Sequence, residues 1–323
     1  MTTSTNRHVK ILLIIVMIVV IIVALFYILQ ICRYLRLRSR NRLYELDKLY
    51  GKCPFKRHDH KYRVVISLST IPERVKLLGP TLASLLDQSI HVDEIAINLP
   101  YVSRKGKAYT VPKWLKRLKH VKIYRVDVDE GPGTKLLPTL RRESPSTRII
   151  VVDDDNIYHS ETIKLLLRVH HYHLHKADQD NPSSYYQGPN ELVAVTNYGV
   201  CLDEDGDLPD VPERIMAAFY SERQVDLLQG FSGFLVTPGM FPFEALKIEN
   251  CPKECISVDD IWFSGWLTIN QVPIISSANM YGHLPLLTLG DIRKTPALAH
   301  GENKDFVTDK KVIQWFRHEY GIW

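Results

Sequence analysis

The stretch TRIIVVDDDNIY, residues 147–158, decides the fold. Its first half is a run of β-branched apolar residues, which is typical of a strand buried on both faces of a parallel sheet. Three consecutive aspartates follow at 153–155. Neighbouring carboxylates repel each other and are costly to remove from water, so a bound cation would stabilise them. The stretch therefore predicts a buried strand that ends in a cation site.

Similar apolar runs occur earlier in the chain and alternate with helical spacing of apolar residues. Strands alternating with helices indicate an α/β fold, in which a mostly parallel central sheet is covered by helices. Ligands bind such sheets at the carboxyl ends of the strands, which is where the aspartates lie. The predicted strands are 63–69, 94–99, 121–126 and 148–152, and the predicted helices are 73–86 and 135–142.

The second half of the chain is less regular. We predict strands at 192–196 and 229–237 and a helix at 261–269. Residues 278–300 contain many loop-forming residues, and long loops over a rigid sheet usually carry a substrate site.

The N-terminal region has a different composition. Residues 11–29 carry no charge and, as a helix, would match the hydrocarbon thickness of a bilayer. We therefore predict a short tail at 1–10, a transmembrane anchor at 11–31 that contacts the lipid bilayer, a basic stem at 32–62 and one α/β domain at 63–323.

The charge is unevenly distributed along the chain. Residues 1–62 contain 12 Lys and Arg against 3 Asp and Glu, whereas the remainder contains 29 against 33. A nucleic-acid-binding protein would carry positive charge on its domain, so this function is excluded. The arginines after the apolar run are predicted to contact lipid headgroups, and by the positive-inside rule they favour a cytoplasmic domain.

The aspartate run contains an Asp-x-Asp motif. In a loop that follows a strand, Asp153 and Asp155 can point the same way and share a hard cation. Mg²⁺ and Mn²⁺ prefer such oxygen ligands and commonly also hold substrate phosphates. The alternative is a solvated acidic turn, or a helix N-cap formed by Asp155 or Asn156.

A second motif, GPGTK, lies at residues 131–135. Gly131 and Gly133 would let the backbone approach a ligand, and Lys135 would neutralise phosphate charge. The alternative is an ordinary turn that begins a helix. The motif lacks the spacing of a Walker P-loop.

The order of these motifs resembles that of the GT-A glycosyltransferases of family-2 type, which bind a nucleotide-sugar through a divalent metal on an Asp-x-Asp. The segments VVISLSTIPERV, DEIAINLP, DEGPGTKLLPTL and IIVVDDD carry the resemblance over residues 64–155, and QGFSGFLV and SVDDIWFSGW carry it over 229–266. The resemblance implies a Rossmann-like GT-A fold, with a nucleotide-sugar-binding half at 63–160 and an acceptor half at 190–323.

The resemblance also implies a metal site. Asp153 and Asp155 would hold the cation and, through it, the diphosphate, while Asp154 would lie against the ribose or the sugar. Members of this fold often take a third ligand from a late histidine. His300 is the predicted ligand, and His283 is the other candidate.

The nucleotide would contact two further segments. The resemblance places Ser69, Thr70 and Arg74 along the nucleoside. It places Lys135 near the base or the phosphates, in agreement with the role deduced above from its charge.

Asp259 and Asp260 form the second acidic pair. Inverting members of this fold use a carboxylate near a helix start as the base that deprotonates the acceptor hydroxyl, so the resemblance predicts Asp260, and secondly Asp259, as catalytic. The alternative is a charge pair that the helix dipole favours.

The glycine-containing segment QGFSGF would form a floor beneath the sugar, with Gly233 part of it. Trp262 or Trp266 could stack on that sugar, although both could equally belong to the core.

The predicted function is metal-dependent glycosyl transfer, with Mn²⁺ or Mg²⁺ as the cofactor. The donor would be a nucleoside-diphosphate-sugar and the acceptor a glycan, glycoprotein or glycolipid in a membrane of the Golgi or ER type. Inversion is what the resemblance implies. Transfer of one sugar at a time is expected because the Gln-x-x-Arg-Trp signature of processive synthases is absent. The alternatives are a phosphohydrolase or nucleotidyltransferase, and a non-catalytic anchored sugar-binding scaffold.

Overall fold

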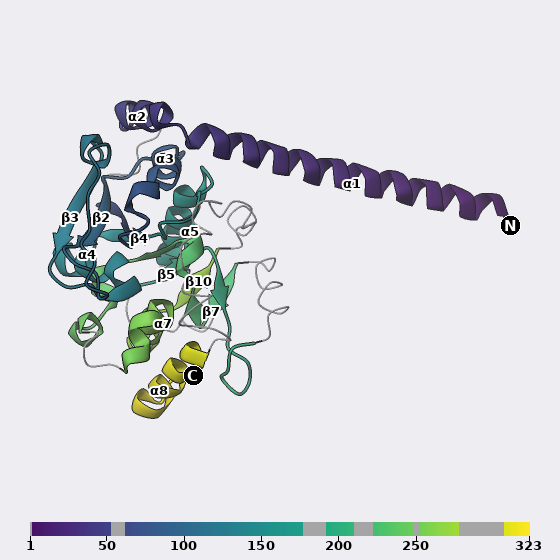
Figure 1. Cartoon of the computed structure of the whole chain (residues 1–323). Coiled ribbons are helices and arrows are strands. Elements are labelled where there is room, and N and C mark those ends of the chain that lie inside the picture. The colour runs from purple at the N-terminus through teal and green to yellow at the C-terminus, as the bar shows by residue number, and fades with distance from the viewer. Residues whose placement is uncertain (1, 53–61, 177–191, 210–221, 248–251, 278–306) are drawn as a thin grey trace.

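An eight-stranded sheet forms the centre of the computed structural model (Figure 1). The structure describes residues 2–52, 62–176, 192–209, 222–247, 252–277 and 307–323. The strand order is β3-β2-β1-β4-β9-β5-β10-β7, and β6 and β8 form a separate pair. The strands are β1 (Val64–Ser69), β2 (Glu94–Pro100), β3 (Val121–Val126), β4 (Arg148–Val151), β5 (Ala194–Thr196), β6 (Gly199–Val200), β7 (Arg223–Val225), β8 (Leu227–Leu228), β9 (Phe234–Val236) and β10 (Ile274–Ser276).

The half of the sheet formed by β3, β2, β1 and β4 is entirely parallel. In the other half β5 and β10 are parallel, while β9 runs antiparallel to both β4 and β5, and β7 runs antiparallel to β10. The first strand of the sheet is β1. The chain then forms β2 and β3 on one side of β1 and returns to form β4 on the other side. Sheets of this type usually bind ligands where the strand order reverses, which in this sheet is at the carboxyl ends of β1 and β4. The mixed α/β fold with a large, mostly parallel sheet is as predicted.

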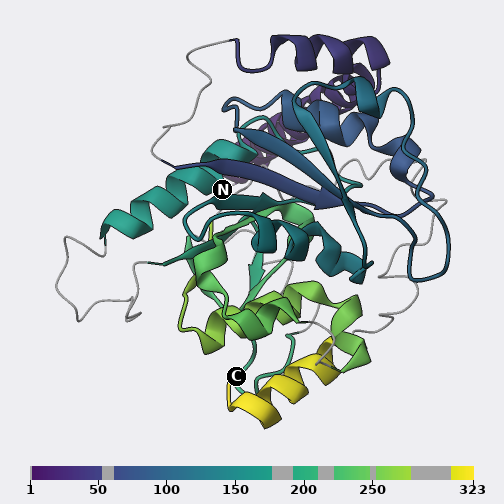
Figure 2. The same cartoon turned by 90° about the vertical axis from the view of Figure 1, so that its left-hand side faces the viewer.

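Helices cover both faces of the sheet (Figure 2). The α-helices are α1 (Thr2–Leu37), α2 (Arg40–Leu49), α3 (Gly79–Leu86), α4 (Leu137–Arg142), α5 (Thr162–Lys176), α7 (Asp259–Ile269) and α8 (Val307–Tyr320). Short 3₁₀ helices are η2 (Val75–Leu77), η3 (Leu115–Arg117), η4 (Gly131–Lys135), η5 (Gly230–Ser232), η6 (Pro238–Met240), η7 (Phe243–Leu246) and η9 (Lys253–Ser257).

The alternation of side chains along the strands separates two hydrophobic cores. Ile150 of β4 points into the core that contains α2, α3 and α5. Its neighbours Ile149 and Val151 point into the core that contains α4, α7 and α8. Because both faces are buried, β4 needs a continuous apolar sequence, and the aspartates come where that burial ends.

Two predicted elements differ from the observed ones. The helix predicted at 73–86 is interrupted, because Pro80 occupies the first turn of α3 and confines the preceding residues to the 3₁₀ turn η2. The strand predicted at 229–237 is shortened to β9. Gly233, with φ of 89°, separates β9 from η5, so the residues before it leave the sheet.

Helix α1 projects away from the domain (Figure 1). Among the helices in the described residues, none combines the length and the apolar character needed to cross a bilayer. The transmembrane anchor predicted at 11–31 is therefore not supported. The apolar run lies within α1, a single helix that begins at Thr2 and ends at Leu37. Leu37 is buried in the first core.

The start of the predicted basic stem packs against the domain. Leu43 and Leu46 of α2, and Tyr50 just after it, are buried in the first core together with side chains of β1 and α3. Asp87, just after α3, attracts three of the arginines that were predicted to contact lipid, namely Arg33, Arg36 and Arg42 at 3.7, 3.4 and 3.5 Å. A fourth, Arg40, stacks on the ring of Trp114 at 3.7 Å. Their charges face the protein because a carboxylate and an aromatic ring lie within reach.

Candidate functional site

Two groups of carboxylates meet at the carboxyl ends of β1 and β4. Asp153, Asp154 and Asp155 follow β4 directly, and the pair Asp259 and Asp260 begins α7. Asp154 and Asp259 are buried and the other three are partly exposed. The fold thus brings together two acidic motifs that lie about a hundred residues apart in the sequence.

Lys135 links the two groups. Its Nζ lies 3.0 Å from Asp153 Oδ1, 3.2 Å from Asp259 Oδ2 and 3.6 Å from Asp260 Oδ1. Burial alone would lower the pKa of Lys135, but the charges of these three carboxylates outweigh burial and hold the pKa well above its usual value. Lys135 therefore carries a positive charge inside the carboxylate cluster. Its predicted contact with the base or the phosphates stays a prediction.

Arg74 balances the other side of the cluster. Its guanidinium lies 2.7 Å from Asp154 Oδ1 and 3.2 Å from Asp155 Oδ2. The Thr70 hydroxyl donates to the second oxygen of Asp154, and the Thr81 hydroxyl donates to the Asp154 carbonyl at 2.8 Å. Asp154 is consequently held by its neighbours on both oxygens, which suits it to positioning the loop.

Burial shifts several of the carboxyl groups. It raises the pKa of Asp155 to about 7, with the charges of Asp153 and Asp154 acting in the same direction. It also raises the pKa of Asp259 to about 7, although Lys135 opposes the shift. The pKa of Asp260 is raised by burial too. Burial is the largest cause of each shift, because it disfavours the charged form of a carboxyl group.

The charge balance of the cluster fits a divalent cation. Five carboxylates face two cationic side chains, Lys135 and Arg74. Asp153 and Asp155 would offer the oxygen ligands that Mg²⁺ and Mn²⁺ prefer. Across the described ranges, no three His, Cys, Asp or Glu side chains converge as a complete ligand set. The predicted third ligand, His300, and the other candidate, His283, lie outside the described residues.

The segment QGFSGF approaches the cluster closely. A Cβ atom built on Gly230 would lie 2.4 Å from Lys135 Nζ and 2.8 Å from Asp260 Oδ1, so a larger residue there would displace these two charged groups. The Gly230 N–H donates to Asp260 Oδ2 at 2.9 Å. Gly233 has a positive φ and lies near the carbonyl of Val151, at the end of β4. Both glycines therefore permit a close approach of backbone to the site.

Several predicted residues make contacts within the protein. Trp262 and Trp266 are buried in the second core, where Trp262 Nε1 donates to the Ala245 carbonyl at 3.1 Å, so neither can stack on a sugar. Gly131 has φ of 62°, and a Cβ there would lie 2.8 Å from the Ile256 carbonyl. Its missing side chain serves packing between η4 and η9. Ser69 donates to the Asn98 carbonyl at 2.9 Å.

Sequence reasoning missed two residues that immediately follow the aspartates. Asn156 Nδ2 donates to the Phe231 carbonyl at 2.7 Å, and the hydroxyl of the buried Tyr158 accepts the Asp153 N–H at 2.7 Å. The only signal in the sequence was their proximity to the Asp-x-Asp, because both of their roles depend on contacts made across the fold.

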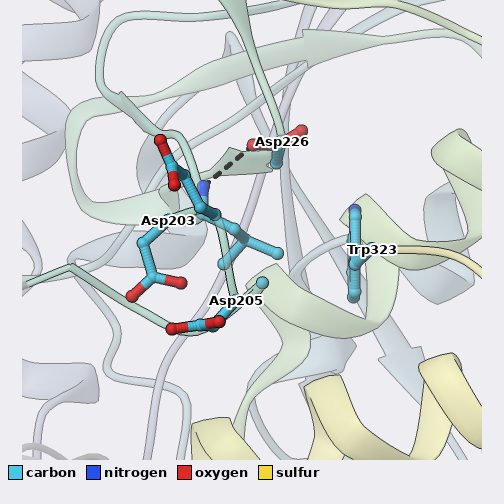
Figure 3. A pocket seen from close by; sticks show the side chains of 7 residues that line it. Asp203, Asp205, Asp226 and Trp323 are labelled. Carbon is cyan, nitrogen blue, oxygen red and sulfur yellow. Dashed lines mark hydrogen bonds between the residues drawn. The ribbon is translucent and has the colours of Figure 1, made fainter.

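A separate hollow of about 260 Å³ lies elsewhere (Figure 3). Leu202, Asp203, Glu204, Asp205, Gly206, Asp226 and Trp323 line it. Asp226 Oδ2 accepts the Leu202 N–H at 2.8 Å, which is the bond drawn in Figure 3. The hollow shares no residue with the carboxylate cluster.

No family model and no curated protein matches the chain. Among solved structures, the Pyrobaculum calidifontis mannosyltransferase PcManGT, in complex with GDP-Man and Mn²⁺, has a TM-score of 0.37 and 14% identity over 72% of this chain and 60% of that chain. GalNAc-T7 with UDP, GalNAc and Mn²⁺ has a TM-score of 0.40 and 10% identity, over 67% of this chain and 42% of that chain. S. aureus TarS 1–349 in complex with UDP-GlcNAc has a TM-score of 0.41 and 14% identity, over 66% of this chain and 56% of that chain.

The chain thus spans 60% of the first of these proteins and less of the other two. At these TM-scores and identities the similarity carries no argument about the chemistry of this chain. The interpretation of the site rests on its own residues.

Proposed function

We propose that this protein is a divalent-cation-dependent glycosyltransferase that moves one sugar, with inversion, from a nucleoside-diphosphate-sugar to an acceptor hydroxyl. The observation that carries the proposal is the cluster of five carboxylates against two cationic side chains, Lys135 and Arg74. It lies where the strand order reverses, which is the usual ligand position of such sheets.

Asp153 and Asp155 would hold the cation, with His300 as the proposed third ligand. Bound there, a divalent cation supplies positive charge against the departing diphosphate. Thr70 and Arg74 fix Asp154 from the β1 side, so the aspartate loop keeps its shape while donor binds and product leaves. The adjacent segment 69–74 is the proposed contact surface for the nucleoside.

Asp260 is the proposed base. Its Oδ2 accepts the Gly230 N–H, while its Oδ1 accepts no hydrogen bond within the described residues and lies 3.6 Å from Lys135 Nζ. Oδ1 itself is buried. In the proposed reaction Oδ1 takes the proton of the acceptor hydroxyl as the acceptor oxygen bonds to the anomeric carbon and the bond to the diphosphate breaks. Asp259 is more deeply buried, with 7% of its side chain exposed against 23% for Asp260.

Thermal stability of the full chain against a panel of nucleoside diphosphates, with and without Mn²⁺, tests the proposal. A diphosphate that binds through the cation should stabilise the protein only when Mn²⁺ is present, by roughly 2.7 kcal/mol at 100 times its Kd. The base of that diphosphate then identifies a donor for a transfer assay, and the anomeric configuration of the product tests inversion.

A matched pair of double variants makes the test specific. Asp153→Ala with Asp155→Ala should abolish the Mn²⁺-dependent shift. Asp203→Ala with Asp205→Ala removes another Asp-x-Asp, on the separate hollow, and should leave the shift unchanged. A folded wild-type chain that no diphosphate stabilises would contradict the proposal, and retention of the shift after loss of Asp153 and Asp155 would contradict the site.

A further inference from the structure

The segment η5 is hydrogen-bonded both to Asp260 and to the loop that follows the aspartate run. On one side the Gly230 N–H donates to Asp260 Oδ2 at 2.9 Å. On the other side the carbonyl of the next residue, Phe231, accepts from Asn156 Nδ2 at 2.7 Å and lies 3.3 Å from the Tyr158 hydroxyl. Two consecutive residues, Gly230 and Phe231, therefore connect the proposed base with the loop that follows the Asp-x-Asp.

The Tyr158 hydroxyl occupies the centre of this connection. It accepts the Asp153 N–H at 2.7 Å, and its single proton faces two carbonyls, that of Phe231 at 3.3 Å and that of Asp153 at 3.4 Å. The side chain is buried, and the Tyr158 N–H is itself fixed by the Ser84 hydroxyl at 3.1 Å. The phenol is thus held in one place by α3 and by the first aspartate of the motif.

The far side of the segment is fixed independently. Asn197, which follows β5, donates its Nδ2–H to the Ser232 carbonyl at 2.9 Å and its backbone N–H to the Gly233 carbonyl at 3.0 Å. Ser277 in turn donates to Asn197 Oδ1 at 2.9 Å. The segment is therefore hydrogen-bonded to Asn197 after β5 and to the aspartate loop. Only the bonds to the aspartate loop lie next to the proposed cation site.

We infer that Tyr158 is a positioning residue that joins the aspartate loop to η5, so that the cation site and Asp260 keep a fixed mutual position. The coupling itself follows from the hydrogen bonds, and its effect on catalysis rests on the function proposed above. A buried N–H or carbonyl that loses its partner destabilises its local arrangement, so removal of one hydroxyl should loosen both loops.

Tyr158→Phe removes only that hydroxyl, and the chain contains a matched control. Tyr50 is also a buried phenol; its hydroxyl accepts the Val92 N–H at 2.8 Å and lies 3.5 Å from the Val92 carbonyl. Its hydrogen bonds connect the end of α2 with Val92, which lies just before β2. Tyr50 makes no contact with the carboxylate cluster among the described hydrogen bonds. Tyr50→Phe should therefore cost similar stability and leave the site unaltered.

Amide hydrogen exchange of the full chain, read by mass spectrometry, tests the coupling without any assay of activity. The informative amides are those of Gly230 and Gly233, because Tyr158 bonds to neither directly. In Tyr158→Phe we expect exchange in residues 229–236 to accelerate at least tenfold, together with that of Asp153. In Tyr50→Phe acceleration should be confined to the region of Val92. Wild-type exchange at 229–236 in Tyr158→Phe would overturn the inference.

Steady-state kinetics then tests the catalytic consequence. At saturating donor and Mn²⁺, Tyr158→Phe should lower kcat at least tenfold and raise the half-saturating Mn²⁺ concentration. Asn156→Ala leaves the Asp153 N–H partnered and removes one bond to Phe231, so it should lower kcat with little change in half-saturating Mn²⁺. A kcat within twofold of wild type in Tyr158→Phe would refute the positioning role. If the wild-type chain transfers no sugar, the proposed function fails, while the exchange result still decides the coupling.

Discussion

At the scale of single residues, Lys135 stabilises the carboxylate cluster, because its ammonium group pairs with three of the carboxylates. Lys135→Met keeps the length of the side chain and leaves Asp153, Asp259 and Asp260 without their shared cation. Loss of one partner from a buried ion pair typically costs about 3–5 kcal/mol, so we expect the free energy of unfolding to fall by roughly 3 kcal/mol in urea denaturation. Mn²⁺ should restore part of the loss.

Lys122→Met is the control for the Lys135 variant. The Lys122 side chain is 64% exposed and pairs with Glu94 at 3.1 Å. Exposed ion pairs contribute little, so this variant should remain within about 1 kcal/mol of wild type. Equal stability of the two variants would show that Lys135 does not balance the cluster.

Asp260 and Asp259 differ in their access to an acceptor, and their amide variants distinguish them. Removal of a general base typically lowers the rate about 10²- to 10⁴-fold, so Asp260→Asn should lower kcat in that range while the Mn²⁺-dependent binding of nucleoside diphosphate persists. Asp259→Asn should retain more activity because the Asp259 side chain is buried away from an acceptor. The reverse order of the two kcat values would assign the base to Asp259.

At the scale of single elements, α5 buries a histidine that cannot be charged at low cost. Neither ring nitrogen of His170 has a hydrogen-bond partner in the described part of the chain, and burial, with the nearby charge of Arg148, lowers the pKa of His170 to about 3. Below about pH 6.5 the unfolded chain binds a proton that the folded chain excludes, so His170 lowers stability as the pH falls from about 6.5 toward 3.

The contribution of His170 is measurable as a difference between variants. Wild type should lose up to about 1.4 kcal/mol per pH unit relative to His170→Leu across that range. Asp155 and Asp259 act in the opposite direction, because their raised pKa values let the folded state keep protons, but they cancel in the difference. A pH-independent difference for His170→Leu would contradict the prediction.

At the scale of the whole molecule, Asp87 determines how the N-terminal helices are attached. It is the shared ion-pair partner of Arg33, Arg36 and Arg42, and its side chain is 15% exposed. Asp87→Ala should release the end of α1 and the start of α2, seen as faster tryptic cleavage at these arginines and a loss of about 1–3 kcal/mol. Glu45→Ala removes a 64% exposed partner of Arg42 and should change neither. Unchanged cleavage in Asp87→Ala would show that the buried leucines alone hold these helices.

Local sequence determined the elements and the position of the acidic loop. The apolar runs at β1, β2, β3 and β4 specified strands buried on two faces, and the alternation with helices specified the α/β sheet, because both depend on spacing within a few residues. Asp153–155 were placed correctly at a strand end for the same reason. Pro80 and Gly233 changed boundaries without changing the architecture. The compartment, the membrane orientation and the domain boundaries stay predictions.

The tertiary structure alone decided which charges and hydrogen bonds meet at the site. Lys135 reaches Asp153 and Asp260 only because the β1–β4 neighbourhood and the start of α7 converge, and no spacing in the chain encodes that approach. The same holds for the bond between Tyr158 and the Phe231 carbonyl, and for the burial of Trp262. Sequence periodicity indicates which face of an element is buried. Long-range packing determines what that face contacts, and the site is built from such contacts.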